Sequence, residues 1–208
     1  MQPAIMVLGA LAEVIGWRLV ATGRATVWRL MPPVLAGMAV GAVLVRRPLV
    51  ATRVGDGLAL GVGLASGLVL YGGTRVFVAI AGRWEPFRSH VVEKYAEAAT
   101  ISLQRSLALS LLIMVPAEEL FWRGLFQARV DRSLVAAAAG AWTWVAYAGV
   151  NLTSGSLPII AGAVVGGALW AGLAVWSGGM LASLASHMLW TGLMLAVPPR
   201  DGRGVRAA

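Results

Sequence analysis

Two adjacent carboxylates, Glu118 and Glu119, stand in the apolar stretch MVPAEELFWRGLF, residues 114–126, with Arg123 four positions after the second. Residues four apart share a helix face, so we expect Glu119 and Arg123 to form a structural ion pair, while Glu118 points about 100° away. A carboxylate in the middle of a membrane span is unfavourable by ~2.5–3.5 kcal/mol even on insertion scales, and such residues usually mark function. Glu118 is therefore a candidate functional residue, unless the pair ends the span and Glu118 lies at the headgroup level.

Two later apolar stretches carry polar side chains that could meet the first glutamate. Tyr147 and Asn151 are four residues apart on one predicted helix, and His187 and Thr191 are four apart on another. We expect Tyr147 to support the site. His187 is the one histidine within a predicted span, because His90 falls in a charged segment. A lone histidine on an apolar face is often only a hydrogen-bonded core residue, but a position inside the membrane favours a functional role.

The elements that must position these residues are predicted to be membrane-spanning helices. Of the 208 residues, 59% are hydrophobic and 12% are charged, about half the charged share of a soluble domain, and the mean hydropathy is +0.78. Several apolar runs approach the ~20 residues that cross a bilayer core: 3–21, 30–45, 57–81, 101–121, 134–151, 157–177 and 179–197. We predict one integral membrane domain, residues 1–208, folded as an all-α bundle of about seven spans.

The segment between the third and fourth runs, residues 82–100, mixes charges with aromatic and aliphatic residues. Such a mixture is typical of an amphipathic helix that lies in the membrane interface. The first run lacks a basic leader and a small-residue cleavage site, so we expect a span there and not a signal peptide. Gly162, Gly166 and Gly167 fall at helix-face spacing, which predicts close approach of neighbouring helices.

The net charge of +8 comes from 16 Arg and one Lys against nine acidic residues. The arginines punctuate the apolar runs and form no patch with interleaved aromatic residues, which favours anionic headgroups and topology over nucleic acid as their partners. In a seven-span arrangement the two sides of the membrane carry six and eight of the loop and tail cations, so the positive-inside rule does not fix the orientation. No cysteine is present, which excludes disulfides, thiolate catalysis and cysteine metal sites.

Taken together, the polar motifs resemble those of the CAAX protease and bacteriocin-processing family, or Abi group, which includes the type II CAAX prenyl endopeptidases. That family shows EExxxR, then Phe-xxx-His, then His-xxx-Asn or Asp, each on a separate transmembrane helix. Here the three motifs read EELFWR (118–123), YAGVN (147–151) and HMLWT (187–191). The resemblance covers about residues 100–197, which we take as the catalytic core.

The resemblance implies an intramembrane glutamic endopeptidase that uses activated water and forms no covalent intermediate. Carried across, Glu118 is the general base, Asn151 holds the water, and His187 and Thr191 donate hydrogen bonds to the tetrahedral intermediate. Asn151 replaces the family's histidine and Thr191 its Asn or Asp, so the base role falls on Glu118 alone. We expect no cofactor. With one histidine inside the spans we also expect no metal, since a catalytic zinc site typically has three protein ligands.

Three functions remain open at this point. The first is cleavage of a lipid-embedded or lipid-modified protein or peptide, close to its C-terminus and near the membrane surface, by an enzyme of a bacterial cytoplasmic membrane. The second is a catalytically degenerate relative that binds a hydrophobic peptide in an immunity or chaperone role, which the replacements at Asn151 and Thr191 favour. The third is a small transporter with a protonatable Glu118.

Overall fold

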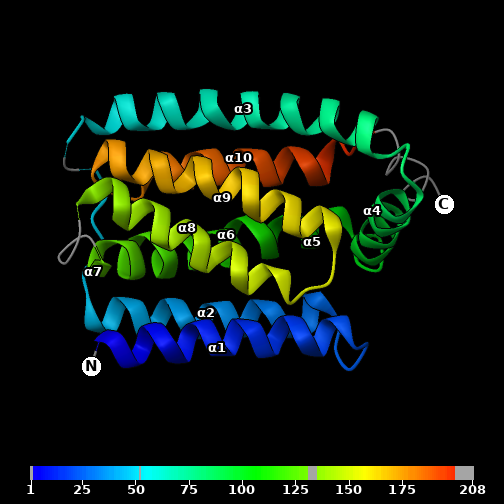
Figure 1. The fold of residues 1–208 in the computed structure, drawn as a ribbon, viewed down its shortest axis with the longest axis horizontal. Coiled ribbons are helices and arrows are strands. Elements are labelled where there is room, and N and C mark those ends of the chain that lie inside the picture. Colours follow the sequence, from blue (N-terminus) through cyan, green and yellow to red (C-terminus); the bar gives the residue numbers. More distant parts are fainter. Residues whose placement is uncertain (1, 52, 131–134, 200–208) are drawn as a thin grey trace.

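The computed structural model describes residues 2–51, 53–130 and 135–199, and all regular elements in this part of the chain are helices (Figure 1). In chain order they are α1 (Gln2–Ala21), α2 (Val27–Val45), α3 (Asp56–Ala81), α4 (Glu85–Ala98), α5 (Leu103–Leu109), η1 (Ser110–Met114), α6 (Val115–Glu119), η2 (Leu120–Gln127), α7 (Ala128–Val130), α8 (Ala136–Leu152), α9 (Leu157–Ser177) and α10 (Leu181–Ala196). The elements from α5 to α7 follow one another without a gap and form one long helix, which we call the central helix. The predicted all-α fold is confirmed.

The helices differ in how readily they cross a bilayer. α1, α2, α3 and α9 are 19 to 26 residues long and apolar enough to span a membrane alone, and α4 with the central helix adds a fifth candidate bent by 98°. α8 and α10 have only 17 and 16 residues. They start later than the predicted runs, because Val135 is extended and because the turn before α10 continues to Met180. The chain is an integral membrane protein with four or five long candidate spans and two shorter helices, where the sequence predicted about seven spans.

Figure 1 shows most helices running roughly side by side, with α1 and α2 along one side of the bundle and α3 along the opposite side. α10 packs along α3, α8 pairs with α9, and the central helix contacts α2, α8 and α10. α4 lies across one end of the bundle. This arrangement brings together the three helices that carry the predicted motifs.

A glycine lets α3 lie against the part of α10 that carries His187. A Cβ atom at Gly67 would lie 2.8 Å from the carbonyl oxygen of Ser186. No other residue allows the two backbones to approach this closely, and such small-residue contacts are common between membrane helices. The contact therefore fixes the distance between α3 and the turn of α10 that carries His187.

The central helix departs from regular α geometry on both sides of the two glutamates. Pro116 has no backbone N–H, so the carbonyl four residues earlier loses its α-helical donor. Just before it, the Val115 N–H donates to the Ser110 carbonyl five residues back, which is the π-helical spacing. The π-helical stretches η1 and η2 flank α6, which carries Glu118 and Glu119. Insertions of this kind are frequent at functional sites.

The amphipathic helix predicted within residues 82–100 is present as α4. Phe87, Val91 and Tyr95, spaced four residues apart, form one buried cluster with Val78 of α3. The Tyr95 hydroxyl also donates a hydrogen bond to the carbonyl of Met194 on α10 at 3.2 Å. α4 therefore closes the end of the bundle next to the last turn of α10.

Candidate active site

α6 places both glutamates inside the protein, but in different surroundings. The Glu119 side chain is fully buried. The Glu118 side chain keeps 11% of its exposure and lies at the wall of a cavity. Adjacent residues on a helix point about 100° apart, so one side of α6 faces the cavity and the other faces packed protein.

The ion pair expected between Glu119 and Arg123 is present. Nη1 of Arg123 lies 3.2 Å from Oε1 of Glu119, and both side chains are fully buried. Nη2 donates to the carbonyl of Gly167 on α9 at 3.3 Å. The guanidinium carbon lies 4.8 Å from the centre of the Tyr147 ring and 5.7 Å from that of Trp170, within the range of cation–π contacts. Arg123 therefore links the central helix to α8 and α9 while it compensates the buried carboxylate.

His187 joins the two glutamates through opposite sides of its ring. Nδ1 lies 3.0 Å from Oε1 of Glu119, and Nε2 lies 3.8 Å from Oε2 of Glu118. Trp170 stacks on the imidazole, with ring centres 3.6 Å apart and planes at 18°. A carboxylate only accepts hydrogen bonds, so Nδ1 donates in its contact with Glu119, and Nε2 is directed toward Glu118. Glu119 thus also orients the imidazole, a contact that helix spacing alone did not predict.

Tyr147, and not Asn151, is the α8 residue that contacts Glu118. Its hydroxyl donates to Oε2 of Glu118 at 3.1 Å, and its ring packs edge to face on Trp122 with centres 5.6 Å apart. Nδ2 of Asn151 donates to the carbonyl of Tyr147 on its own helix at 3.0 Å. Asn151 lines the same cavity as Glu118, and its amide has a second N–H for a ligand there.

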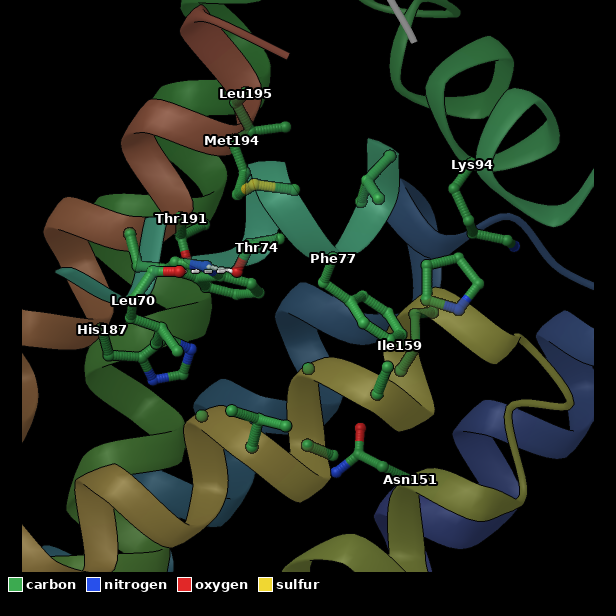
Figure 2. Close-up of a pocket in the computed structure, with 18 of the residues that line it drawn as sticks. Leu70, Thr74, Phe77, Lys94, Asn151, Ile159, His187, Thr191, Met194 and Leu195 are labelled. Atoms are coloured by element: carbon green, nitrogen blue, oxygen red, sulfur yellow. Dashed lines mark hydrogen bonds between the residues drawn. The ribbon is translucent and has the colours of Figure 1, made fainter. Parts of the chain in front are cut away.

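The cavity beside Glu118 has a volume of about 730 Å³ and is bounded by α3, α4, α8, α9, α10 and the central helix. In Figure 2, Asn151 and His187 reach it from different helices, and Thr191 follows one turn after His187. Its walls are mainly apolar, and the side chains drawn there include Leu70, Phe77, Ile159, Met194 and Leu195. The cavity is suited to an apolar ligand that reaches a few polar groups at one wall.

Five of the predicted site residues line this cavity, namely Glu118, Tyr147, Asn151, His187 and Thr191. The other two, Glu119 and Arg123, lie behind its wall and hold the imidazole and α9. The structure thus brings the residues of all three motifs together. The catalytic roles taken from the resemblance stay predictions.

The glycines of α9 leave room for aromatic rings of the site. A Cβ atom at Gly162, Gly166 or Gly167 would come within 2.8–3.2 Å of the ring of Trp190, Trp170 or Tyr147, respectively. The sequence predicted that these glycines bring helix backbones together. Their neighbours are instead the rings that surround His187 and contact Glu118.

Sequence reasoning missed a third buried carboxylate, Glu13 of α1. It is fully buried, and its Oε2 accepts a hydrogen bond from Nε1 of Trp122 at 3.0 Å. Trp122 in turn packs against Tyr147, the residue that contacts Glu118. Glu13 is the one acidic residue in the run 3–21. The signal that singled out Glu118, an ionisable residue inside a span, applies equally to Glu13.

Among the residues that the structure describes, no three His, Asp or Glu side chains converge as metal ligands. His187 lies between the two glutamates and turns a different ring nitrogen toward each. The three groups therefore share no common coordination point in this part of the chain.

Residues 102–193 match the family model described as type II CAAX prenyl endopeptidase Rce1-like. The resemblance predicted from the three motifs is confirmed. Comparisons with curated proteins and with solved structures gave no match. The Rce1-like segment runs from the start of the central helix into α10, so it contains all three motifs and leaves out α1 to α4. The match supports a membrane endopeptidase of the CAAX-protease type, that is, a hydrolase with a membrane-embedded peptide substrate.

Proposed function

We propose that the protein is an intramembrane glutamic endopeptidase in which Glu118 activates the attacking water. The observation that carries this proposal is the 3.8 Å separation between Oε2 of Glu118 and Nε2 of His187 at the cavity wall. That separation is too long for a direct hydrogen bond, and one water molecule fits in contact with both atoms. Tyr147 donates to the same carboxylate oxygen and orients it.

The proposed reaction needs no covalent enzyme intermediate. The water oxygen bonds to the carbonyl carbon of the substrate peptide while one water proton passes to Glu118. The tetrahedral intermediate carries its negative charge on the former carbonyl oxygen. When the C–N bond breaks, the proton held by Glu118 moves to the leaving amine nitrogen, and the carboxylate is restored.

The geometry favours a division of roles that differs from the one implied by the resemblance. His187, held by Glu119 through Nδ1, contributes Nε2 to the water. Asn151 and Thr191 lie at the cavity wall, where an amide N–H and a hydroxyl are suitable donors to the developing oxyanion. In this proposal His187 therefore binds the water and not the oxyanion, whereas Asn151 binds the oxyanion and not the water. The catalytic core, residues 100–197, supplies all four groups.

The apolar walls of the cavity favour a lipid-embedded or lipid-modified substrate segment. Leu70, Phe77 and Val78 of α3 line it together with Phe87 and Val91 of α4, and Phe77 packs edge to face on Phe87. Lipid tails are as apolar as these walls, so a membrane-embedded substrate segment gains van der Waals packing in the cavity and no hydrophobic free energy. Apolar walls of this kind accept such a segment without charged contacts.

The test is cleavage by the full-length protein reconstituted into lipid vesicles. The substrates are membrane-anchored reporters with apolar C-terminal segments, with and without a lipid group, and mass spectrometry identifies the new C-termini. We expect cleavage by the wild type and by Glu93→Gln, a matched control at an exposed position, but not by Glu118→Gln. The proposal fails if the wild type releases no more product than Glu118→Gln from any reporter. A reporter that is still bound under those conditions would identify a peptide-binding relative.

A further inference from the structure

A second cavity, of about 120 Å³, lies at the end of the bundle opposite to α4 (Figure 1). The loop between α2 and α3, the η2–α7 end of the central helix, the start of α8 and the end of α9 line it. We call it the arginine pocket, because Arg46, Arg53 and Arg123 all face it together with the amide side chain of Gln127. It belongs to neither the apolar cavity nor the set of residues proposed for catalysis at Glu118.

Backbone hydrogen bonds fix the loop that carries two of the three arginines. The N–H groups of Met180 and Leu181 donate to the carbonyls of Leu49 and Val50 at 3.0 and 2.9 Å, and the Arg53 N–H donates to Ser177 at 3.0 Å. Leu49, Val50 and Arg53 therefore bind the loop to the turn between α9 and α10. Nη1 of Arg53 also donates to a carbonyl of α9 at 2.9 Å, so this guanidinium has a defined place at the rim.

A glycine in that turn makes the attachment possible. A Cβ atom at Gly179 would collide with the carbonyl group of Val50. Gly178 just before it has a φ of 72°, in the left-handed region that favours glycine. The turn is thus shaped to receive the loop, and the arginine pocket is a built feature of the fold.

The arginine pocket is strongly positive. Arg53 is exposed, Arg46 is half-buried, and the Arg123 side chain at its inner end is fully buried. No Asp or Glu stands among the described residues that line it. Glu119 compensates the charge of Arg123 from outside this wall, so Arg46 and Arg53 give the pocket its net positive charge. Guanidinium groups that converge in this way favour an anion that accepts several hydrogen bonds at once.

We propose that the arginine pocket binds a phosphate group. Its volume is about four times the ~30 Å³ that one water occupies in the liquid, which is enough for a tetrahedral oxyanion. Phosphate matches the planar, multiple donors of arginine. The pocket lies at the end of a membrane bundle, where the loop between α2 and α3 meets the turn between α9 and α10, and basic pockets between membrane helices bind phosphorylated lipid headgroups. The phosphate comes from an anionic lipid or from inorganic phosphate.

The experiment measures thermal unfolding of the full-length protein in a neutral detergent and in lipid nanodiscs. One arm adds inorganic phosphate to the detergent sample at constant ionic strength, and the other compares phosphatidylcholine discs with discs that contain phosphatidylglycerol. Stabilisation in the first arm identifies a free phosphate site, and stabilisation in the second alone identifies a headgroup site. We expect Arg46→Gln and Arg53→Gln each to weaken the apparent affinity by about ten- to a hundredfold, as for the loss of a hydrogen bond to a charged group.

Arg47→Gln is the matched control, because Arg47 is exposed, adjacent to Arg46 and not part of the wall. It should bind like the wild type, and so should Glu118→Gln, which keeps this test separate from the proposed protease function. No stabilisation in either arm overturns the proposal. An equal loss in Arg47→Gln also overturns it, because that result means a diffuse attraction of the surface for anions.

Discussion

Glu118 and Glu119 are neighbours on one helix, yet the two sides of α6 give them different tasks. On the cavity side, Glu118 meets Tyr147, the Nε2 of His187 and open volume. On the packed side, Glu119 meets Arg123 and the Nδ1 of His187 with no exposure at all. A reactive carboxylate needs room for water and substrate, whereas a supporting one needs a compensating charge. The surroundings therefore favour Glu118 over its identical neighbour for the proposed chemistry.

His187 connects the two sides. Its Nδ1 contacts the carboxylate of Glu119, and its Nε2 is directed toward the carboxylate of Glu118. A hydrogen bond to one ring nitrogen sets the state of the other, so the packed side controls what the cavity side offers to a water molecule. Stacking on Trp170 holds the ring plane. The comparison thus predicts that the cavity side governs rate and the packed side governs stability.

The largest expected effect is the loss of cleavage in Glu118→Gln. Glutamine keeps the acceptor for the Tyr147 hydroxyl but cannot take a proton, so we expect the rate to fall by about 10²–10⁴-fold. The thermal midpoint should change little, because no buried charge loses a partner. Cleavage assays and thermal unfolding on the same preparation measure both quantities. A Glu118→Gln protein that still cleaves at the wild-type rate would show that the carboxylate on the cavity side of α6 does not govern the rate.

The packed side is tested by Arg123→Ala. Removing one partner of a buried ion pair leaves an uncompensated charge, so we expect a loss of ~3–5 kcal/mol in the free energy of unfolding. The contact with the Gly167 carbonyl is lost as well. Equilibrium unfolding in detergent measures the change, with Arg47→Ala as the exposed control. If Arg123→Ala and Arg47→Ala have the same free energy of unfolding, the Glu119–Arg123 pair does not stabilise the fold.

Glu13 connects α1, which lies outside the Rce1-like segment, to the site through its hydrogen bond with Trp122. Glu13→Ala removes the acceptor of the Trp122 N–H, and an unsatisfied buried donor is unfavourable by about 1–3 kcal/mol. Glu13→Gln keeps an acceptor and should stay near wild-type stability. Because Trp122 packs on Tyr147, we also expect slower cleavage in Glu13→Ala, with kcat affected more than KM. If Glu13→Ala and Glu13→Gln have the same stability and the same cleavage rate, the hydrogen bond to Trp122 contributes to neither.

Much of the site could be predicted because its signals are local. Hydropathy marked the helices, and i,i+4 spacing predicted the Glu119–Arg123 pair. The motif order predicted the resemblance that the Rce1-like match over residues 102–193 confirms, and the three motif helices do surround one cavity. These inferences depend on residues within a few turns of one another or on a known pattern.

The remainder depends on how helices are rotated against each other. Whether Tyr147 or Asn151 reaches Glu118 is set by the packing of α8 on a central helix with π-helical stretches, which no periodicity rule includes. The bond between Glu13 and Trp122 joins residues 109 positions apart. The start of α10 depends on a turn that is shaped to receive a distant loop. Local spacing carries no information on such contacts.

The smallest expected effect is that of Asn151→Ala, although the resemblance alone implies a large one. The loss of a preorganised donor from the reacting centre typically slows an enzyme by about 10²–10³-fold. In this structure one amide N–H of Asn151 bonds to the Tyr147 carbonyl of its own helix, so only its second N–H is left for the oxyanion, and Thr191 offers another donor at the same cavity. We therefore expect a decrease of about tenfold or less, and a larger decrease for Tyr147→Phe, which removes a direct hydrogen bond to the charged form of Glu118.

Asn151→His sharpens this last prediction, because it restores the residue that the resemblance places at the position. Imidazole can accept a proton near neutral pH, which an amide cannot. If water is held by Glu118 and His187 alone, the substitution should be tolerated with turnover close to that of the wild type. If turnover rises well above the wild type while Asn151→Ala is as inactive as Glu118→Gln, the water is held from α8. The roles of Asn151 and His187 proposed above must then be exchanged, since only a residue that contacts the water affects the rate in both directions.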